Sequence, residues 1–187
     1  MKKYLKMPKI NFDHYQLRTL ELKDAKDMLL YASDPLVTKY LTWDNFYTLK
    51  EAEWSIKNVF FPRVKRGLPI GYAIIDLTKD LMIGTIDFHQ YDEVRNEAEI
   101  GFVLNQSYWH KGIMTKALAK LIEVGFDYLG YDSIIIKHMV ENTASAKVIL
   151  RNNFIFFDYE TTIHKNKEYR LKQYRLTKEQ YHDIKKS

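Results

Sequence analysis

The sequence of 187 residues contains no cysteine and only seven glycines and four prolines. The absence of cysteine excludes disulfides, a cysteine nucleophile and thiolate metal ligands. The few glycines and prolines are scattered and mark no linker, and no internal repeat divides the chain. We therefore expect a single domain that spans residues 1–187.

Other absences narrow the class of protein further. The basic N-terminus lacks the apolar segment of a signal peptide, and no apolar run approaches the roughly 18 residues that a membrane helix needs. We therefore expect a soluble, cytoplasmic protein with no membrane partner. The six histidines form no His-x-x-x-His pair, so we predict no metal centre.

The net charge of +5 is distributed unevenly along the chain. Residues 1–9 carry +4 and residues 164–187 carry +5, whereas residues 10–163 carry −4. An acidic body disfavours a basic groove for nucleic acid and suits a cationic amine. A ribosome-binding or RNA-binding module stays the alternative, supported by the basic ends and the 14 tyrosines. The sequence shows no helix-turn-helix or RNA-recognition signature.

Hydrophobic periodicity predicts the order β α α β β β α β α β β. The fold class is therefore α/β, with a mixed, mostly antiparallel central sheet flanked by helices and one β-α-β crossover. The near-continuous apolar run of strand Ser133–Met139 predicts burial on both faces. The expected strands are residues 15–20, 69–77, 82–91, 97–104, 133–139, 154–163 and 168–176. The expected helices are residues 25–32, 48–62, 112–129 and 143–152, and residues 177–186 follow the last strand as a polar, basic tail helix.

The most informative segment runs from Glu99 to Leu118. A predicted strand enters a polar loop, and the loop begins a helix at Gly112. The first turn of a helix offers unpaired N–H groups and a partial positive charge, and a glycine there lets a phosphate approach the backbone. Lys111 adds a point charge. The spacing alone allows two interpretations, a pyrophosphate site or an ordinary helix start with a glycine for tight packing.

Five segments in order resemble the Gcn5-related N-acetyltransferase (GNAT) family. They match the branch that contains ribosomal-protein alanine/serine N-terminal acetyltransferases and spermidine acetyltransferases. The resemblance covers nearly the whole chain, and the predicted order of elements agrees with the family's. The segments are Leu17–Ala25, Tyr40–Trp43 with the helix after Thr48, Ala98–Phe102, Tyr108–Leu118 and Glu141–Phe154.

The resemblance implies the GNAT (acyl-CoA N-acyltransferase) fold and an acetyl-CoA-dependent N-acetyltransferase. In such an enzyme a primary amine attacks acetyl-CoA directly in a ternary complex. Backbone groups near Val103 and the side chain of Asn142 would hold the pantetheine, and Lys147 with Arg151 would reach the 3′-phosphate. The residues implied to bind acetyl-CoA are Phe102, Val103, Leu104, Trp109, His110, Lys111, Gly112, Ile113, Met114, Thr115, Asn142 and Lys147.

Two side chains are candidates for the chemistry. Glu99 is the candidate base, and its apolar neighbours lead us to expect a raised pKa. Glu97, two positions away on the same strand face, is the substitute. Ser145 is the candidate donor to the departing thiolate. The simpler alternatives are that Glu99 pairs with a basic neighbour, and that Asn142 and Ser145 begin an ordinary helix.

The sequence departs from the family pattern at three positions. Met114 is bulkier than the usual small residue and could narrow the phosphate loop. Asn153 replaces a glycine, although asparagine tolerates the left-handed conformation. Ile149 stands where many members carry an acidic tyrosine. These departures motivate a second alternative, a degenerate domain that binds CoA without catalysis.

The acceptor stays open at this stage. The substrate side is aromatic, and it could take a protein N-terminus, a polyamine, an aminoglycoside or another small amine. The aromatic residues expected there are Tyr40, Trp43, Phe46 and Trp54. A homodimer could form by pairing of strands or of the final hairpin.

Overall fold

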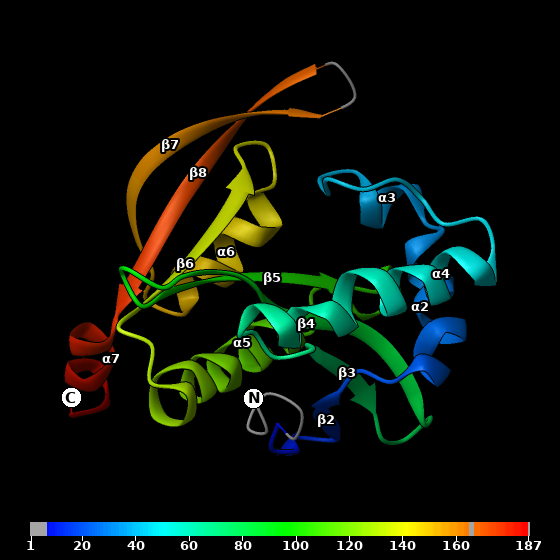
Figure 1. Cartoon of the computed structure of the whole chain (residues 1–187), viewed down its shortest axis with the longest axis horizontal. Coiled ribbons are helices and arrows are strands. Elements are labelled where there is room, and N and C mark those ends of the chain that lie inside the picture. The colour runs from blue at the N-terminus through cyan, green and yellow to red at the C-terminus, as the bar shows by residue number, and fades with distance from the viewer. Residues whose placement is uncertain (1–6, 165–166, 187) are drawn as a thin grey trace.

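The structure is a computed structural model that describes residues 7–164 and 167–186 (Figure 1). The basic residues Lys2, Lys3 and Lys6, and residues 165–166 of the expected final turn, lie outside the described residues.

The described strands form one mixed sheet in the order β1-β2-β3-β4-β5-β6-β8-β7. All neighbours are antiparallel except β5 and β6, which are parallel and joined through a helix, as the predicted crossover requires. The mostly antiparallel α/β class is therefore confirmed. The strands are β1 Ile10–Phe12, β2 Tyr15–Thr19, β3 Tyr72–Asp76, β4 Leu81–Asp92, β5 Glu97–Leu104, β6 Ser133–Met139, β7 Ile155–His164 and β8 Lys167–Thr177.

The longer helices lie where the periodicity predicts them, but two of them continue into π-helical turns, and the first of these then ends in a 3-10 segment. The helix that starts at Leu49 continues as η2 and η3, and the helix that starts at Ile113 continues as η5. The bounds are η1 Leu22–Asp24, α2 Ala25–Ala32, α3 Pro35–Thr38, α4 Leu49–Ser55, η2 Ile56–Phe60, η3 Phe61–Arg66, η4 Gln106–Tyr108, α5 Ile113–Glu123, η5 Val124–Leu129, α6 Thr143–Arg151 and α7 Lys178–Lys186.

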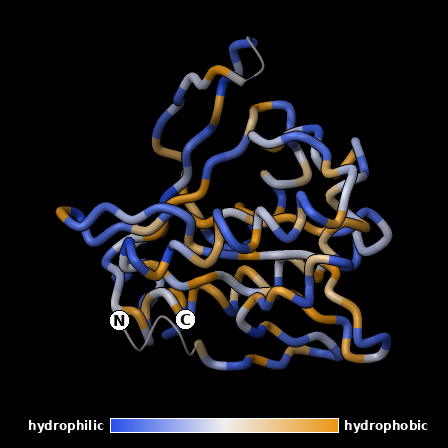
Figure 2. Tube along the Cα trace, turned by 45° about the vertical axis from the view of Figure 1, so that its right-hand side comes forward, coloured by the Kyte–Doolittle hydropathy of each residue, from blue (hydrophilic) through white to orange (hydrophobic). Residues whose placement is uncertain are grey.

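Alternate residues of the central strands fill two separate cores. Ile74 of β3 packs in the core that includes α5 and α6, whereas its neighbours Ala73 and Ile75 pack in the core of α2 and α4. The sheet is therefore covered on both faces in this region, as alternation along a strand requires. Hydrophilic positions predominate along the projecting β7–β8 hairpin and are interrupted by a few hydrophobic ones (Figure 2).

Local signals set several element ends. The Thr48 hydroxyl accepts the Glu51 N–H at 3.3 Å, and the Glu51 carboxylate accepts the Thr48 N–H at 2.7 Å, which is the expected capping box. Asn153 follows α6 with φ +63°, as expected for a left-handed residue. The first helical segment begins with a capping box between Glu21 and Asp24.

Three local expectations need correction. The leader before β2 contains the short strand β1, which pairs with β2 and has too few residues to show a period. β3 is shorter than expected because it starts only after Gly71, whose φ is +119°. β6 is not buried on both faces: Ile134 and Ile136 are buried, while the alternate Ile135 is half-buried on the face that carries the Lys137 side chain.

Strand β7 forms one edge of the sheet and exposes several large apolar side chains. They are Ile155, Phe156, Phe157, Tyr159 and Ile163. The expected homodimer stays a prediction.

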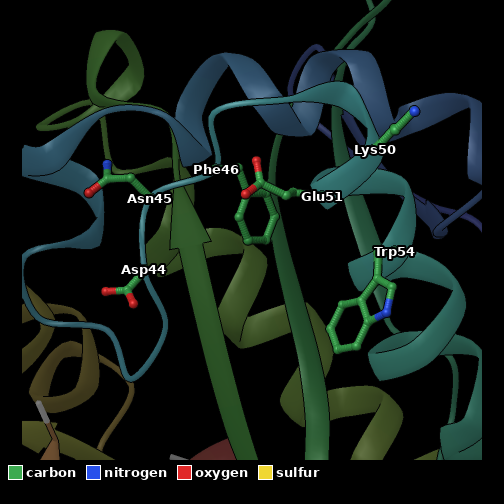
Figure 3. A pocket seen from close by; sticks show the side chains of 6 residues that line it. All are labelled: Asp44, Asn45, Phe46, Lys50, Glu51 and Trp54. Carbon is green, nitrogen blue, oxygen red and sulfur yellow. The ribbon is translucent and has the colours of Figure 1, made fainter.

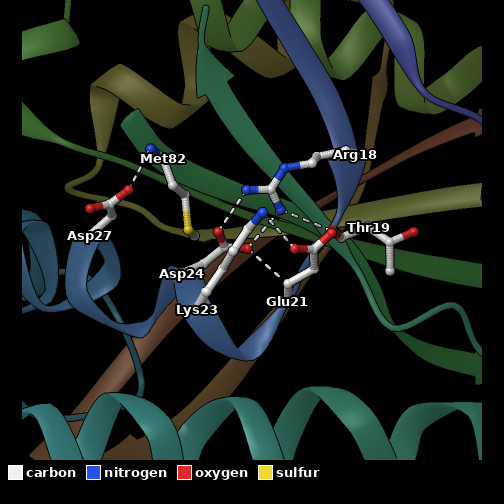
Figure 4. Close-up of polar contacts among 7 residues, drawn as sticks. All are labelled: Arg18, Thr19, Glu21, Lys23, Asp24, Asp27 and Met82. Atoms are coloured by element: carbon white, nitrogen blue, oxygen red, sulfur yellow. Dashed lines mark hydrogen bonds and ion pairs between the residues drawn. The ribbon is translucent and has the colours of Figure 1, made fainter. Parts of the chain in front are cut away.

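A buried ion pair joins β2 to the first helical segment (Figure 4). Asp24 is 3% exposed and accepts two hydrogen bonds from the Arg18 guanidinium, at 2.6 and 2.8 Å. Its carboxylate also accepts the Glu21 N–H at 2.8 Å. On the next helix, Asp27 accepts the Met82 N–H at 2.9 Å, which ties α2 to β4. These carboxylates hold the α2 side of the molecule against the sheet.

Replacing Asp24 by alanine should destabilise the fold by about 3 kcal/mol, because it leaves the Arg18 charge largely buried without its partner. Urea unfolding measures the loss. Lys23→Ala removes an exposed pair with Glu21 and should cost less than about 0.5 kcal/mol. Equal effects of the two substitutions would contradict the anchoring role of Asp24.

Candidate active site

The site begins where β5 and β6 separate. The two strands pair from Glu97 and Ser133 to Ile100 and Ile136, and beyond these residues β6 diverges from β5 (Figure 1). Residues 101–104 of β5 remain paired with β4 on their other side. Their second backbone edge therefore faces no strand of the described chain, and its N–H and C=O groups need partners of another kind.

A cleft of about 720 Å³ opens over this point. Its walls come from β5 and β6, the loop of residues 40–43, the η2–η3 segment and the β7–β8 hairpin. Five of the predicted site residues line it, namely Glu99, Phe102, Val103, Asn142 and Ser145. Leu104, residues 109–115 and Lys147 are not part of the lining.

The phosphate-type loop leads from the end of β5 into α5. Gly112 is the N-cap of α5 and has φ +74°, a conformation that glycine adopts without strain. A Cβ added at Gly112 would meet no atom within 4 Å, so tight packing is the wrong explanation for this glycine. The space above it leaves room for a ligand at a helix N-terminus.

Hydrogen bonds hold this loop against β3 and against the end of β5. The Tyr108 hydroxyl donates to the Asp76 carboxylate at 2.9 Å, and Thr78 donates to the same carboxylate at 2.6 Å. Burial acts to raise the pKa of Asp76, but the hydrogen bonds from Thr78 and Tyr108 outweigh it and the pKa is lowered. The Trp109 indole donates to the Leu104 carbonyl at 2.8 Å. That contact already engages one of the carbonyls expected to bind a ligand.

The remaining loop side chains turn different ways. Lys111 donates to the Ser107 carbonyl at 2.9 Å and lies over the Tyr108 ring. His110 is exposed and has φ +61°. Ile113 and Met114 are buried in the core that includes α5. The bulk of Met114 therefore packs into the core rather than into the mouth of the loop.

Helix α6 supplies the second wall. The Asn142 Oδ1 accepts the Ser145 N–H at 3.1 Å, so Asn142 is the N-cap of α6 and only its amide group can donate to a ligand. Lys147 and Arg151 are exposed on the same helix. Ile149 is fully buried, which makes that position part of the core.

Glu99 lies in the cleft within a charged cluster. Its Oε1 is 3.2 Å from the His89 Nε2, and its Oε2 is 3.2 Å from the Lys137 Nζ. Lys137 also contacts Glu160 at 2.7 Å. Burial acts to raise the pKa of Glu99, but His89 and Lys137 outweigh it, so the pKa is lowered. The expected rise in pKa was wrong.

Glu97, the expected substitute for Glu99, has its carboxylate engaged outside the cleft. Its carboxylate accepts the Arg175 Nε–H at 2.7 Å and the Ser133 hydroxyl at 2.6 Å. It is not part of the cleft lining.

Sequence reasoning missed several charged residues of the cleft. Arg63 is 5% exposed and pairs with Asp87 at 2.7 Å, and both line the cleft with His89. The alternation of Thr85, Asp87 and His89 along an otherwise apolar strand is a signal that could have identified one polar face. No sequence signal connects that face to Arg63, Lys137 or Glu160.

The aromatic residues of the substrate side divide between two places. Tyr40 and Trp43 line the cleft. Phe46 and Trp54 line a separate pocket of about 410 Å³ on α4 and the preceding loop, together with Asp44, Asn45, Lys50 and Glu51 (Figure 3).

Two kinds of feature are absent from the described residues. No group of three or more potential ligating side chains is placed to hold a metal ion. No helix there is both long and apolar enough to cross a membrane.

Comparison with protein families agrees with this architecture. The family model "Acetyltransferase (GNAT) domain" matches residues 15–155, which is most of the chain. The chain belongs to the GNAT family. An uncharacterized N-acetyltransferase, p20 of Bacillus licheniformis, is 35% identical over 148 residues, covering 77% of this chain and 83% of p20. The protein is an N-acetyltransferase, as its sequence predicts.

Two further relatives resemble this acetyltransferase. The ribosomal-protein-serine acetyltransferase of Escherichia coli is 36% identical over 87 residues, covering 46% of this chain and 49% of that one. The structure of RimL, a ribosomal L7/L12 alpha-N-protein acetyltransferase in complex with coenzyme A, superposes with a TM-score of 0.80 at 20% identity. That match covers 91% of this chain and 98% of RimL, and it shows a shared fold.

The cluster around Glu99 makes a direct prediction about its ionisation. Lys137→Gln removes a cation that favours the carboxylate, so the Glu99 pKa should rise. Carboxyl-carbon NMR titration measures this change. In the unsubstituted protein Glu99 should titrate below its ordinary value, and it should then stabilise the fold at neutral pH and cease to do so as pH falls through its folded pKa. Lys120→Gln, which removes a pair with Glu123 on α5, should leave Glu99 unchanged. An unchanged Glu99 pKa in Lys137→Gln would contradict the assigned cause.

Proposed function

We propose that this acetyltransferase transfers the acetyl group of acetyl-CoA to the amine of a polypeptide N-terminus, by direct attack in a ternary complex. The observation that carries the proposal is the free backbone edge of residues 101–104 inside the cleft. The N-terminus of α5 follows this edge along the chain, and the Glu99 cluster precedes it. A pantetheine chain and an amine could therefore meet there.

The residues present fit acetyl-CoA. Gly112 and the N–H groups of the first turn of α5 suit a pyrophosphate, and no atom occupies the space above Gly112 within 4 Å of an added Cβ. Backbone groups of Phe102 and Val103, with the Asn142 amide, suit the amides of pantetheine. Lys147 and Arg151 are exposed and free to turn towards a 3′-phosphate.

The acetyl donor supplies a thioester, and the protein supplies polarisation and hydrogen bonds. An N–H near Val103 would polarise the carbonyl oxygen. The amine lone pair forms the N–C bond, the C–S bond breaks, and its electron pair leaves on sulfur. Ser145, in the cleft wall, would donate a hydrogen bond to that thiolate.

The proton of the amine passes to His89, which Glu99 holds by a hydrogen bond. With its lowered pKa, Glu99 is ionised at neutral pH and can only accept hydrogen bonds, so the His89 Nε2 carries the shared proton. The His89 Nδ1 is then the ring atom that could receive a proton from the amine. Glu99 would hold the ring in place and stabilise its positive charge after the transfer.

This arrangement favours a protein N-terminus over a polyamine. An α-amino group has a pKa of about 8, whereas an alkyl ammonium such as lysine has one of about 10.4. An imidazole is a weaker base than either amine, so the His89–Glu99 pair suits the amine that loses its proton more readily. The names of the two ribosomal-protein acetyltransferase relatives support the same class of acceptor.

Gly112→Glu should abolish acetyl-CoA binding, because it places bulk and negative charge at the anion site. Gly130→Glu is the matched control, because Gly130 also has a left-handed φ, +80°, and an added Cβ there meets no atom within 4 Å. Both substitutions should cost about 1 kcal/mol of stability from backbone strain. Only Gly112→Glu should lose binding in isothermal calorimetry. Unchanged affinity would refute the pyrophosphate site.

An acceptor screen with acetyl-CoA tests the function. Peptides that begin with Ala or Ser should be acetylated on the α-amine, identified by mass spectrometry, in preference to spermidine and aminoglycosides. Glu99→Gln should lower kcat by about 100-fold while CoA affinity is retained. The control is Glu123→Gln, at the last residue of α5, which should retain the full rate. A normal rate for Glu99→Gln at every pH would remove Glu99 from the mechanism.

A further inference from the structure

The charges of the cleft are divided between two sides. On one side the carboxylates of Glu99 and Glu160 both contact Lys137, at 3.2 and 2.7 Å. On the other side Arg63 contacts Asp87 at 2.7 Å, and Arg66 lines the same wall. One side therefore has an excess of negative charge and the other an excess of positive charge.

Arg63 retains hydrogen-bonding capacity although it is buried. It is 5% exposed, and its guanidinium lies 4.3 Å from the centre of the Phe60 ring. Its Nη1 is at ion-pair distance from Asp87, yet neither Nη1 nor Nε makes a hydrogen bond within residues 7–164 and 167–186. These two donors are covered by the protein itself, but Arg63 as a whole lines the cleft. An anion in the cleft would therefore be attracted by a guanidinium that Asp87 leaves incompletely paired.

The two charged sides lie close enough for one small segment to reach both. Asp87 pairs in register with Gly101, and Glu99 is two residues along the same strand. Two strand positions correspond to roughly 7 Å. An amine held near Glu99 would thus place a carboxylate in the same residue, or in the next one or two, within reach of the arginines.

We propose that the cleft selects polypeptide N-termini that carry Asp or Glu within their first three residues, with Arg63 and Arg66 binding that carboxylate. Guanidinium groups suit this role because their planar donors match a carboxylate. The excess negative charge of the Glu99 side attracts the ammonium form of the amine before it loses its proton. This inference rests on the proposed function and specifies its acceptor.

Matched peptides test the preference. The peptides Ser-Glu-Ala-Ala, Ser-Gln-Ala-Ala and Ser-Lys-Ala-Ala differ at the second residue only. With saturating acetyl-CoA, kcat/KM for the Glu peptide should exceed that for the Gln peptide by about tenfold or more, and the Lys peptide should be poorest. The preference should weaken at high salt. Equal values for the Glu and Gln peptides would overturn the proposal, as would more efficient acetylation of free glutamate.

Two neighbouring residues of η3 provide matched variants. Lys65 and Arg66 are both exposed, but only Arg66 lines the cleft. Arg66→Gln should lower the ratio of kcat/KM between the Glu peptide and the Gln peptide several-fold, mainly through KM. Arg66→Lys should restore part of this ratio. Lys65→Gln should leave the ratio as in the unsubstituted protein. An equal effect of both glutamine substitutions would indicate general surface charge and contradict the assignment.

Binding measurements separate this inference from the proposed function. Calorimetry with the CoA-bound protein compares the Glu and Gln peptides without any turnover. Tighter binding of the Glu peptide that depends on Arg66 would support the inference even if no peptide were acetylated, in which case the proposed function alone fails. Acetylation of all three peptides without a charge preference would overturn the inference and leave the proposed function standing.

Discussion

Strands β5 and β6 run side by side for four residue pairs and then part, and the candidate active site depends on this divergence. A fully paired sheet would satisfy every backbone group of residues 101–104 internally and leave no edge for a ligand. Because β4 still holds the other edge of β5, the strand stays extended while one side is free. The same divergence creates the cleft and places the start of α5 beyond its end.

The two cores keep this open arrangement rigid. The α5 core packs one face of the sheet, and the α2–α4 core packs the other. Buried carboxylates reinforce the packing, with Asp24 bound to Arg18 and Asp76 bound to Tyr108. The second of these contacts fixes the loop ahead of Gly112, so that a helix N-terminus is presented at a defined position before any ligand arrives.

Burial in the cleft has opposite consequences for different charges. Burial alone would raise the pKa of Glu99, but His89 and Lys137 lower it and keep the carboxylate ionised. Arg63 is buried with donors that its single acid partner does not satisfy. One part of the cleft is thus suited to a positive amine and the other to a negative group. A chain terminus with an acidic residue carries both.

The sequence by itself determined the order of the longer elements, the Thr48 capping box, the β5-α5-β6 crossover and the glycine that begins α5. All of these depend on residues near one another in the chain, through periodicity, capping and backbone φ. Only the tertiary structure decided the ionisation of Glu99 and the pairing of Arg63 with Asp87. Their partners come from β4, β6 and β7, and the sequence carries no period that connects these segments. The ionisation of a buried side chain depends on which charges the fold brings within a few ångströms, and that distance is set by packing.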